Sequence, residues 1–407
     1  MVCSVVTGWK KLSGEKKWEG LLQPLNPDLR PYLIHNAQSA GAAGDLFNCK
    51  THESDATEQD FFSKACLPSW FGYVAVATDE GKHVLGRRDI LIAWRGTATS
   101  WEWLNDFVFI IQRDASDLFP TAREHKATVH WGFHSLYTGT RSDSPHTKTS
   151  ARQQVLDAVK ELVNKYKDEE TSITVTGFSL GAALATLTAM DIVANGYNKP
   201  TQGDPVMVTA FAYGGPRVGN AGLADVFHTL GDHLHLLRIK NEKDSIPTLP
   251  PWFFSYAEFG IKLIVDTNES KYLKKRIFGS YAVFLDEHEL NDIGSLDEVE
   301  LEYEPKRKRV RSELSSLDED EYEPKRRRVR GILADDYSCH NMDVYAHGVA
   351  IKDVDKNIPA DKLDYDIALV NKYLDRVKNE YKIPPNWWVG DNRKKMFQLQ
   401  NGRWVVI

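Results

Sequence analysis

The amino-acid sequence predicts an α/β fold with a central, mostly parallel sheet that is flanked by helices. Apolar, β-branched runs alternate with amphipathic segments through the middle of the chain, as strands joined by helices do. A glycine-flanked corner joins one such run to a helix, and the chain ends in a hairpin signal at Asn401-Gly402. The 407 residues are enough for one large domain of this class or for two smaller ones.

The first elements are a helix and a strand pair. We expect a helix within residues 16–45, after Pro31. The stretch GYVAVATDEGKHVLGRRDILIAW predicts a β-hairpin, with strands over residues 72–78 and 89–94 and a turn at residues 79–81.

The middle of the chain predicts three strands and two helices. Apolar residues fall on one face of a helix over residues 151–167. A strand over residues 172–176 then leads into a helix over residues 180–195. Residues 206–214 read as a buried strand, and residues 233–247 as a strand that runs into a loop.

The last segment predicts an amphipathic helix and a hairpin. The helix is expected over residues 364–381, DYDIALVNKYLDRVKNEY. The final residues, MFQLQNGRWVVI, place Asn-Gly between two alternating runs, which is a strong hairpin signal.

A charged segment interrupts this alternation. Residues 295–311 read SLDEVELEYEPKRKRVR and residues 316–330 read SLDEDEYEPKRRRVR, an imperfect repeat of an acidic and a basic block. Its low apolar content predicts that residues 286–331 form a mostly disordered insertion in a single domain that spans residues 1–407. The clusters PKRKR and PKRRR are typical of nuclear-import or polyanion-binding patches, although each is also neutralised by its acidic neighbour.

Composition limits the class of protein. The formal net charge of −6 argues against a globally basic nucleic-acid binder and makes any contact with an anionic membrane local. The N-terminal residues lack the apolar core of a signal peptide, and no uncharged run approaches the ~20 residues of a membrane span. The four cysteines have no metal-binding spacing. We therefore expect a cytoplasmic protein without a metal site.

One serine lies at the junction of a predicted strand and a predicted helix. The residues Gly177-Phe178-Ser179-Leu180-Gly181 fit the pattern G-x-S-x-G, between a β-branched run and an alanine- and leucine-rich helix. In such a nucleophile elbow, glycines leave room for the crossing strand and helix, and the hydroxyl stands above the sheet beside a helix N-terminus. This context favours a nucleophile over a simple N-cap serine.

A nucleophilic serine needs a base, and a carboxylate usually orients that base. Asp244, in NEKDSIP at the end of a predicted strand, is a candidate acid, or else a turn residue before Pro247. The segment SCHNMDVYAHGV offers His340 and His347, which would share one face if both were on a helix. Only one of them needs to reach the serine.

The tetrahedral intermediate of acyl transfer needs two hydrogen-bond donors. The backbone N–H of Leu180, directly after the serine, is one candidate. The second is expected in Arg95-Gly96-Thr97, a loop that follows a buried strand. Gly96 permits a close approach, and Thr97 offers both its N–H and its hydroxyl.

These motifs resemble those of the class 3 lipase family, and most closely those of its plant phospholipase A1-II branch. The similar stretches run nearly end to end and include WEGLLQPLNPDLRPYLI, LGRRDILIAWRGT, SITVTGFSLGAALATL, RVGNAGLADVF, NEKDSIP and HNMDVYAHGV. The resemblance implies an α/β-hydrolase fold of the class 3 lipase type and no cofactor. It implies that nucleophile, acid and base are Ser179, Asp244 and His340, and that the oxyanion donors are Thr97 and Leu180. His347 matches a second histidine of the family.

Three features depart from that branch. Phe178 stands where the branch usually has histidine, and we expect it to tune the site. Residues 44–72 look shorter than their equivalent, and the charged repeat lies between Asp244 and His340, where the family has a shorter link. A long surface insertion is tolerated, because loop-closure entropy costs only about 0.6 kcal/mol per doubling of length.

The resemblance implies an enzyme that cleaves the sn-1 acyl ester of glycerophospholipids at a membrane or micelle surface through an acyl-enzyme. The alternatives are a galactolipid or glyceride lipase with the same triad, and a catalytically weak lipase-like interaction protein. In the enzyme, a run of aromatic residues either lines an acyl groove, forms a lid or belongs to the core: Trp101, Trp103, Phe107 and Phe109. No nucleic-acid partner is expected, and the sequence leaves the oligomeric state open.

Overall fold

The computed structural model describes residues 8–48, 71–96, 111–140, 148–275, 283–285, 301–302, 327–329, 339–388 and 390–407. The chain divides into two compact units, of which the larger consists of Met1–Lys275 and Tyr337–Ile407 and the smaller of Arg276–Asp336.

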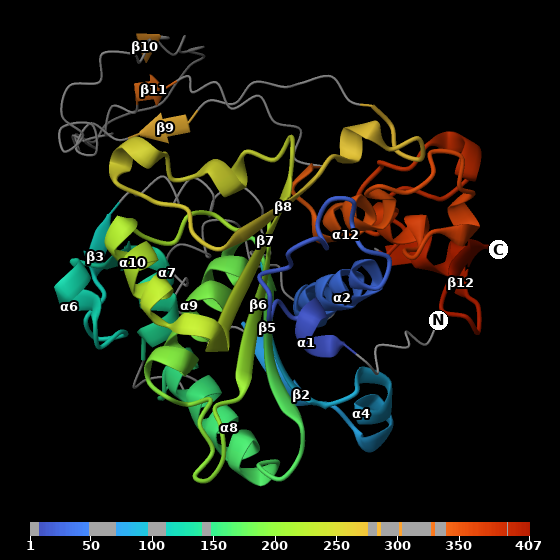
Figure 1. Ribbon diagram of the computed structural model, residues 1–407. Helices are drawn as coiled ribbons and strands as arrows, with labels where there is room; N and C mark the ends of the chain where they lie inside the picture. The colour runs from blue at the N-terminus through green and yellow to red at the C-terminus, as the bar shows by residue number, and fades with distance from the viewer. Residues whose placement is uncertain are drawn as a thin grey trace, which may run out of the picture. The chain divides into compact units, whose positions relative to one another are not determined.

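A six-stranded sheet forms the centre of the larger unit (Figure 1). The strand order is β1-β2-β5-β6-β7-β8. Only β1 and β2 pair antiparallel, and the other neighbours pair parallel. The predicted mostly parallel sheet is confirmed. Its strands are β1 (Gly72–Val76), β2 (Arg88–Trp94), β5 (Thr171–Phe178), β6 (Met207–Tyr213), β7 (Leu234–Asn241) and β8 (Ile261–Val265).

Helices cover both faces of this sheet, as Figure 1 shows for α8 and α9 on one side and α2 and α12 on the other. The side chains of β6 point alternately to the two faces of the sheet. Val208 and Ala210 belong to one buried apolar cluster, and Phe211 and Tyr213 belong to the other. The helices are α2 (Leu29–Asn48), α7 (Trp131–Thr138), α8 (Ala151–Lys165), α9 (Leu180–Ala194), α10 (Ala221–Thr229) and α12 (Met342–Ile351).

Shorter elements complete the larger unit. Two short helices are α1 (Trp9–Leu12) and α6 (Ala122–His125). Two antiparallel pairs are β3 (Gln112–Asp114) with β4 (Thr128–His130) and β12 (Met396–Gln398) with β13 (Trp404–Val406). The second pair confirms the predicted C-terminal hairpin. The short 3₁₀ helices are η2 (Gly231–His233), η3 (Ile246–Thr248), η4 (Trp252–Phe254), η5 (Thr267–Glu269), η7 (Ala360–Lys362) and η10 (Gly390–Lys395).

The connection between β1 and β2 differs from the predicted turn. The two strands pair as expected, but they are joined by helix α4 (Asp79–Leu85). The side chain of Thr78 caps this helix by accepting a hydrogen bond from the Gly81 N–H, and Gly86 ends it with a φ of 72°. The Asp-Glu-Gly sequence that suggested a turn is therefore the acidic first turn of a capped helix.

The predicted amphipathic helix over residues 364–381 is wrong. This segment forms two short 3₁₀ turns, η8 (Ile367–Asn371) and η9 (Asn379–Tyr381). The side-chain oxygen of Asn371 accepts hydrogen bonds from the N–H groups of Arg376 and Val377, at 2.7 and 2.8 Å. Val377 also forms an isolated bridge with Leu273. Pairing with a distant segment and local side-chain bonds thus override the helical periodicity.

In the smaller unit, three short strands form an antiparallel sheet in the order β10-β11-β9. They are β9 (Val283–Leu285), β10 (Leu301–Glu302) and β11 (Arg327–Val329). The rest of the charged segment lies outside the described residues, so its disorder stays a prediction. Among the helices that the structure describes, none is long and apolar enough to cross a membrane.

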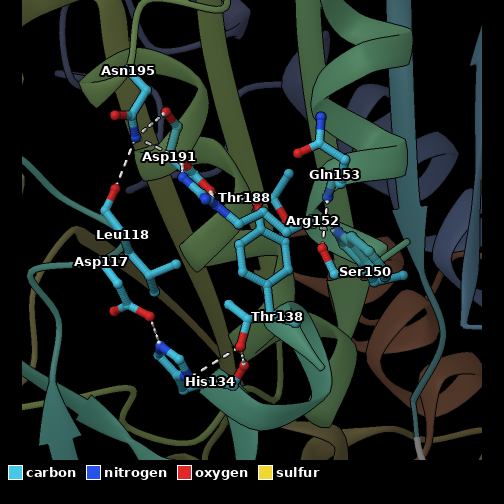
Figure 2. Close-up of polar contacts among 12 residues, drawn as sticks. Asp117, Leu118, His134, Thr138, Ser150, Arg152, Gln153, Thr188, Asp191 and Asn195 are labelled. Carbon is cyan, nitrogen blue, oxygen red and sulfur yellow. Dashed lines mark hydrogen bonds and ion pairs between the residues drawn. The ribbon is translucent and has the colours of Figure 1, made fainter. Parts of the chain in front are cut away.

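One carboxylate fixes the position of α9, the helix that follows Ser179. Asp191 is fully buried, and it accepts hydrogen bonds from Arg152 Nε and Nη2 at 2.5 and 2.9 Å (Figure 2). Tyr137 Oη and Asn195 Nδ2 donate to the same carboxylate at 3.0 and 2.7 Å, and Asn195 Nδ2 also donates to the Leu118 carbonyl at 2.8 Å. These bonds join α9 to α7 and α8.

We predict that Arg152→Met destabilises the fold by about 2–3 kcal/mol, because it leaves the buried Asp191 charge without its cation. The free energy of unfolding, measured in guanidinium chloride, checks this. The additional change Asp191→Asn is expected to recover at least half of the loss. The exposed Arg123→Met is the matched control, with a change within about 0.5 kcal/mol. Equal effects of Arg152→Met and Arg123→Met contradict this role of the pair.

Candidate active site

The corner between β5 and α9 places Ser179 in an uncommon backbone conformation. Its φ and ψ are 56° and −120°, and its N–H donates to the Tyr213 carbonyl of the neighbouring strand at 2.9 Å. Positive φ is rare for residues other than glycine, and such strain persists only where the surroundings enforce it. The G-x-S-x-G sequence thus forms the sharp strand-to-helix turn that it predicted.

The two glycines of this motif are required by close backbone contacts. A Cβ atom on Gly177 would lie 2.1 Å from the Gly181 carbonyl oxygen, and one on Gly181 would lie 2.4 Å from the Trp94 carbonyl oxygen. A larger residue at either position would push α9 away from β5 or β2. The sequence therefore forms this corner because only glycine lets the three elements approach so closely.

The structure brings together Ser179, His340 and Asp244. Ser179 Oγ lies 2.8 Å from His340 Nε2, and His340 Nδ1 lies 2.7 Å from Asp244 Oδ2. The Asp244 side chain is fully buried, and only 11% of the His340 side chain is exposed. Since an ionised carboxylate only accepts, His340 Nδ1 carries the proton in this pair and Nε2 is free to accept from the Ser179 hydroxyl.

Local bonds hold the acid and the histidine in place. Asp244 lies in the loop after β7, where its Oδ1 accepts from the Ile246 N–H at 3.0 Å. His340 lies just before Asn341, the N-cap of α12, whose side chain accepts from the Asp343 N–H at 2.9 Å. Because the N-cap separates them, His340 and His347 do not share a helix face, contrary to the expectation from their spacing.

His347 lies inside α12 and has a different partner. Its Nε2 is 2.8 Å from Ser270 Oγ, and its side chain is fully buried. Burial, with a smaller effect from the Arg376 charge, lowers the pKa of His347 to about 3. The histidine that meets Ser179 is therefore His340, the one to which the family resemblance pointed.

Two aromatic residues lie beside these hydrogen bonds: Phe178, which the sequence analysis expected to tune the site, and Tyr345, which it did not single out. Tyr345 Oη donates to Asp244 Oδ2 at 2.5 Å, the same oxygen that receives His340 Nδ1. The Phe178 ring lies 4.7 Å from the His340 ring and 5.8 Å from the Tyr345 ring. Gly214 leaves this space open, because a Cβ there would lie 3.0 Å from Tyr345 Oη and 3.1 Å from Phe178 Cε2. The one sequence signal for Tyr345 was its place in the HNMDVYAHGV motif.

Half of the predicted oxyanion site falls within the described residues. Leu180 is the first residue of α9, so its N–H has no acceptor within the helix. Thr97 lies outside the described residues, as do the aromatic residues from Trp101 to Phe109. Within the described ranges, no group of three or more His, Cys, Asp or Glu side chains could hold a metal ion.

Comparison with known proteins extends the sequence resemblance. Residues 91–254 match the family described as lipase (class 3). The chain is 35% identical over 442 residues to phospholipase A1-II 4 of Oryza sativa subsp. japonica, an alignment that covers 99% of this chain and 96% of that protein. It is 34% identical to phospholipase A1-IIgamma of Arabidopsis thaliana, with 98% and 92% covered.

Solved lipase structures are more distant. The chain is 22% identical to lipase II from Rhizopus niveus, with a TM-score of 0.38 over 58% of this chain and 81% of that one. The lipase from Rhizopus microsporus var. chinensis gives 23% identity and a TM-score of 0.39, over 59% and 75%.

We predict that Tyr345→Phe lowers kcat/KM for ester hydrolysis roughly 3- to 30-fold, because the Asp244 carboxylate loses a hydrogen-bond donor. The effect should fall on kcat, with KM little changed, and it should nearly vanish in an Asp244→Asn background, since Tyr345 acts through that carboxylate.

The matched control for this change is Tyr365→Phe. Tyr365 is another buried tyrosine, and its hydroxyl donates to Asp343 Oδ1 at 2.6 Å, so it loses the same kind of bond elsewhere. If both changes lower kcat equally, or if the Tyr345 effect persists fully without the Asp244 charge, then Tyr345 does not position the acid.

We also predict a loss of stability in acid from His347. The unfolded chain protonates this side chain below pH 6.5, whereas the folded chain does so only near pH 3. Between these values the folded state loses about 1.4 kcal/mol per pH unit relative to the unfolded state, hence about 2 kcal/mol from pH 7 to 5. Urea unfolding of wild type and His347→Gln should show this extra loss in wild type alone. The exposed His228→Gln is the control; parallel losses in wild type and His347→Gln would rule the effect out.

Proposed function

Because the chain belongs to the class 3 lipase family, in its plant phospholipase A1-II branch, we propose that it cleaves the sn-1 acyl ester of glycerophospholipids. Membership of this family makes the protein a carboxylic ester hydrolase. The observation that carries the proposal is the hydrogen-bonded chain from Ser179 through His340 to Asp244. The relatives named above, both called phospholipases A1, support the choice of substrate.

In the first step, Ser179 Oγ attacks the sn-1 carbonyl carbon while its proton passes to His340 Nε2, 2.8 Å away. The carbonyl π electrons move to the oxygen and form a tetrahedral oxyanion. The buried Asp244 carboxylate stabilises the imidazolium that results and keeps the ring oriented.

The intermediate then collapses. The bond from the carbonyl carbon to the glycerol oxygen breaks, and His340 gives its proton to that oxygen, so that a lysophospholipid leaves. Water next attacks the acyl-enzyme, with His340 as the base, and the fatty acid and the free Ser179 hydroxyl are regenerated. The backbone N–H of Leu180 and, from the sequence resemblance, Thr97 are proposed to donate to the oxyanion.

We expect Ser179→Ala and His340→Ala each to lower the rate about a thousandfold or more, because the two groups act as one unit. The assay uses phosphatidylcholine with distinguishable sn-1 and sn-2 chains. Loss of sn-1 fatty-acid release should coincide with loss of Ser179 labelling by a fluorophosphonate probe. His228→Ala, an exposed histidine, is the control and should keep full activity.

The same assay tests the rival functions. Preferential hydrolysis of monogalactosyldiacylglycerol or triolein would identify a galactolipid or glyceride lipase with the same triad. No hydrolysis of any lipid, together with no labelling of Ser179, would refute the enzyme and favour an interaction protein on a lipase scaffold.

A cytoplasmic location also belongs to this proposal. It is supported by the low cysteine content, with four cysteines in 407 residues. A fluorescent fusion of the full chain should be cytosolic, and it should remain so when PKRKR and PKRRR are changed to alanines. Nuclear signal that disappears with those changes would instead identify the repeat as an import sequence.

A further inference from the structure

Exposed apolar side chains gather in two places on the described part of the chain. One group consists of Ile111, Trp131, Trp252 and Phe253, with exposed fractions of 57, 53, 74 and 55%; we name it the apolar rim. The other is the C-terminal hairpin, with exposed Phe397, Leu399, Val405, Val406 and Ile407. Single exposed apolar residues are ordinary, whereas a contiguous exposed apolar patch marks an interaction surface.

The apolar rim is one structure, although its residues come from three segments. The Trp131 N–H donates to the Ile111 carbonyl at 2.9 Å, and Gln112 Nε2 donates to the Phe254 carbonyl at 3.0 Å. Within η4, the rings of Trp252 and Phe253 lie 6.0 Å apart. In Figure 1 the yellow segment between β7 and β8 lies on the same side of the sheet as β3 and α7, in agreement with these bonds.

The rim is also tied to the candidate active site. Asp244 lies in the loop after β7, and the chain continues from it through η3 to η4. Arg217 holds this loop, because its N–H donates to the Leu249 carbonyl and its Nη1 donates to the Pro250 carbonyl, both at 2.7 Å. Arg217 itself follows β6, the strand whose last carbonyl accepts from the Ser179 N–H. The rim is thus braced against the segments that carry the reacting groups.

The chemistry of the rim fits a zwitterionic lipid surface. Residues 246–257, IPTLPPWFFSYA, contain no ionised side chain, so this loop gives no attraction to an anionic partner. Tryptophan and phenylalanine are the side chains that settle at the boundary of headgroups and acyl chains. The C-terminal hairpin differs, because the exposed Arg393, Lys394 and Lys395 precede it.

We propose that the apolar rim docks the protein on the surface of a zwitterionic phospholipid bilayer, beside the candidate active site. The inference rests on the proposed function, since that surface holds the substrate of a phospholipase. Docking buries Trp252 and Phe253 among the lipid headgroups and holds the loop of Asp244 at the membrane. The rim then gives affinity for the bilayer, while the triad performs the chemistry.

The first test measures binding without hydrolysis. The double change Trp252→Ser and Phe253→Ser is made in the Ser179→Ala protein, and cosedimentation with phosphatidylcholine vesicles is measured at 0.1 and 0.5 M NaCl. We expect the partition coefficient to fall at least about tenfold, because two large apolar side chains no longer leave water. The salt concentration should matter little.

The matched control is Phe397→Ser with Val405→Ser, a cross-strand pair on the C-terminal hairpin whose side chains are 57 and 38% exposed. It should change vesicle binding less than twofold. The conservative Trp252→Phe should retain most of the binding, and circular dichroism confirms that each variant is folded.

The second test separates docking from catalysis. With Ser179 intact, the ratio of the rate on phosphatidylcholine vesicles to the rate on soluble p-nitrophenyl butyrate should fall about tenfold in the rim variant and stay constant in the hairpin variant. A ratio that does not change, vesicle binding that survives the rim changes, or an equal loss in the hairpin variant overturns the proposal. An unchanged vesicle affinity would leave the rim as a surface for a protein partner.

The two proposals fail in different ways. If wild type releases no fatty acid from phosphatidylcholine but the Ser179→Ala protein binds vesicles through the rim, the proposed function is wrong and docking stands. If wild type is active and the rim changes affect neither binding nor the rate ratio, docking is wrong and the proposed function stands.

Discussion

The crossing of β5 and α9 over β2 is the contact on which the rest of the site depends. Gly177 and Gly181 let backbone meet backbone there, at distances that no side chain permits. This forces Ser179 into a positive φ, at a cost of about 1–3 kcal/mol. Burial of α9 on nearly every side offsets that cost, and the bonds of Asp191 fix the far end of the helix.

Two other segments complete the site from far along the chain. Asp244 and His340 are separated by 96 residues, yet their side chains lie 2.7 Å apart because the loop after β7 meets the start of α12. The charged segment lies between them in the sequence, and it leaves this contact intact. Each partner is fixed locally, Asp244 by the Ile246 N–H and His340 by the N-cap of α12. Tyr345, one turn into α12, then binds the same carboxylate oxygen as His340.

Phe178 replaces the histidine that is usual in this branch, and its contacts can be seen only in the tertiary structure. From the sequence alone we expected this apolar ring to tune the active site. The structure places that ring against His340 and Tyr345, in space that Gly214 leaves open. An apolar neighbour excludes water from one face of the imidazole and strengthens its interaction with the buried Asp244.

The sequence by itself determined the parallel strands, the serine corner and the C-terminal hairpin, because each depends on local signals: β-branched runs, flanking glycines and an Asn-Gly turn. It also determined the family, from motifs in order along the chain. The family resemblance already pointed to His340, and the tertiary structure places its ring, and not that of His347, beside Ser179. Only the tertiary structure decided that residues 364–381 are not one helix, and that Tyr345 and the apolar rim adjoin the site. Those outcomes depend on pairing between residues far apart in sequence, which periodicity and propensity do not encode.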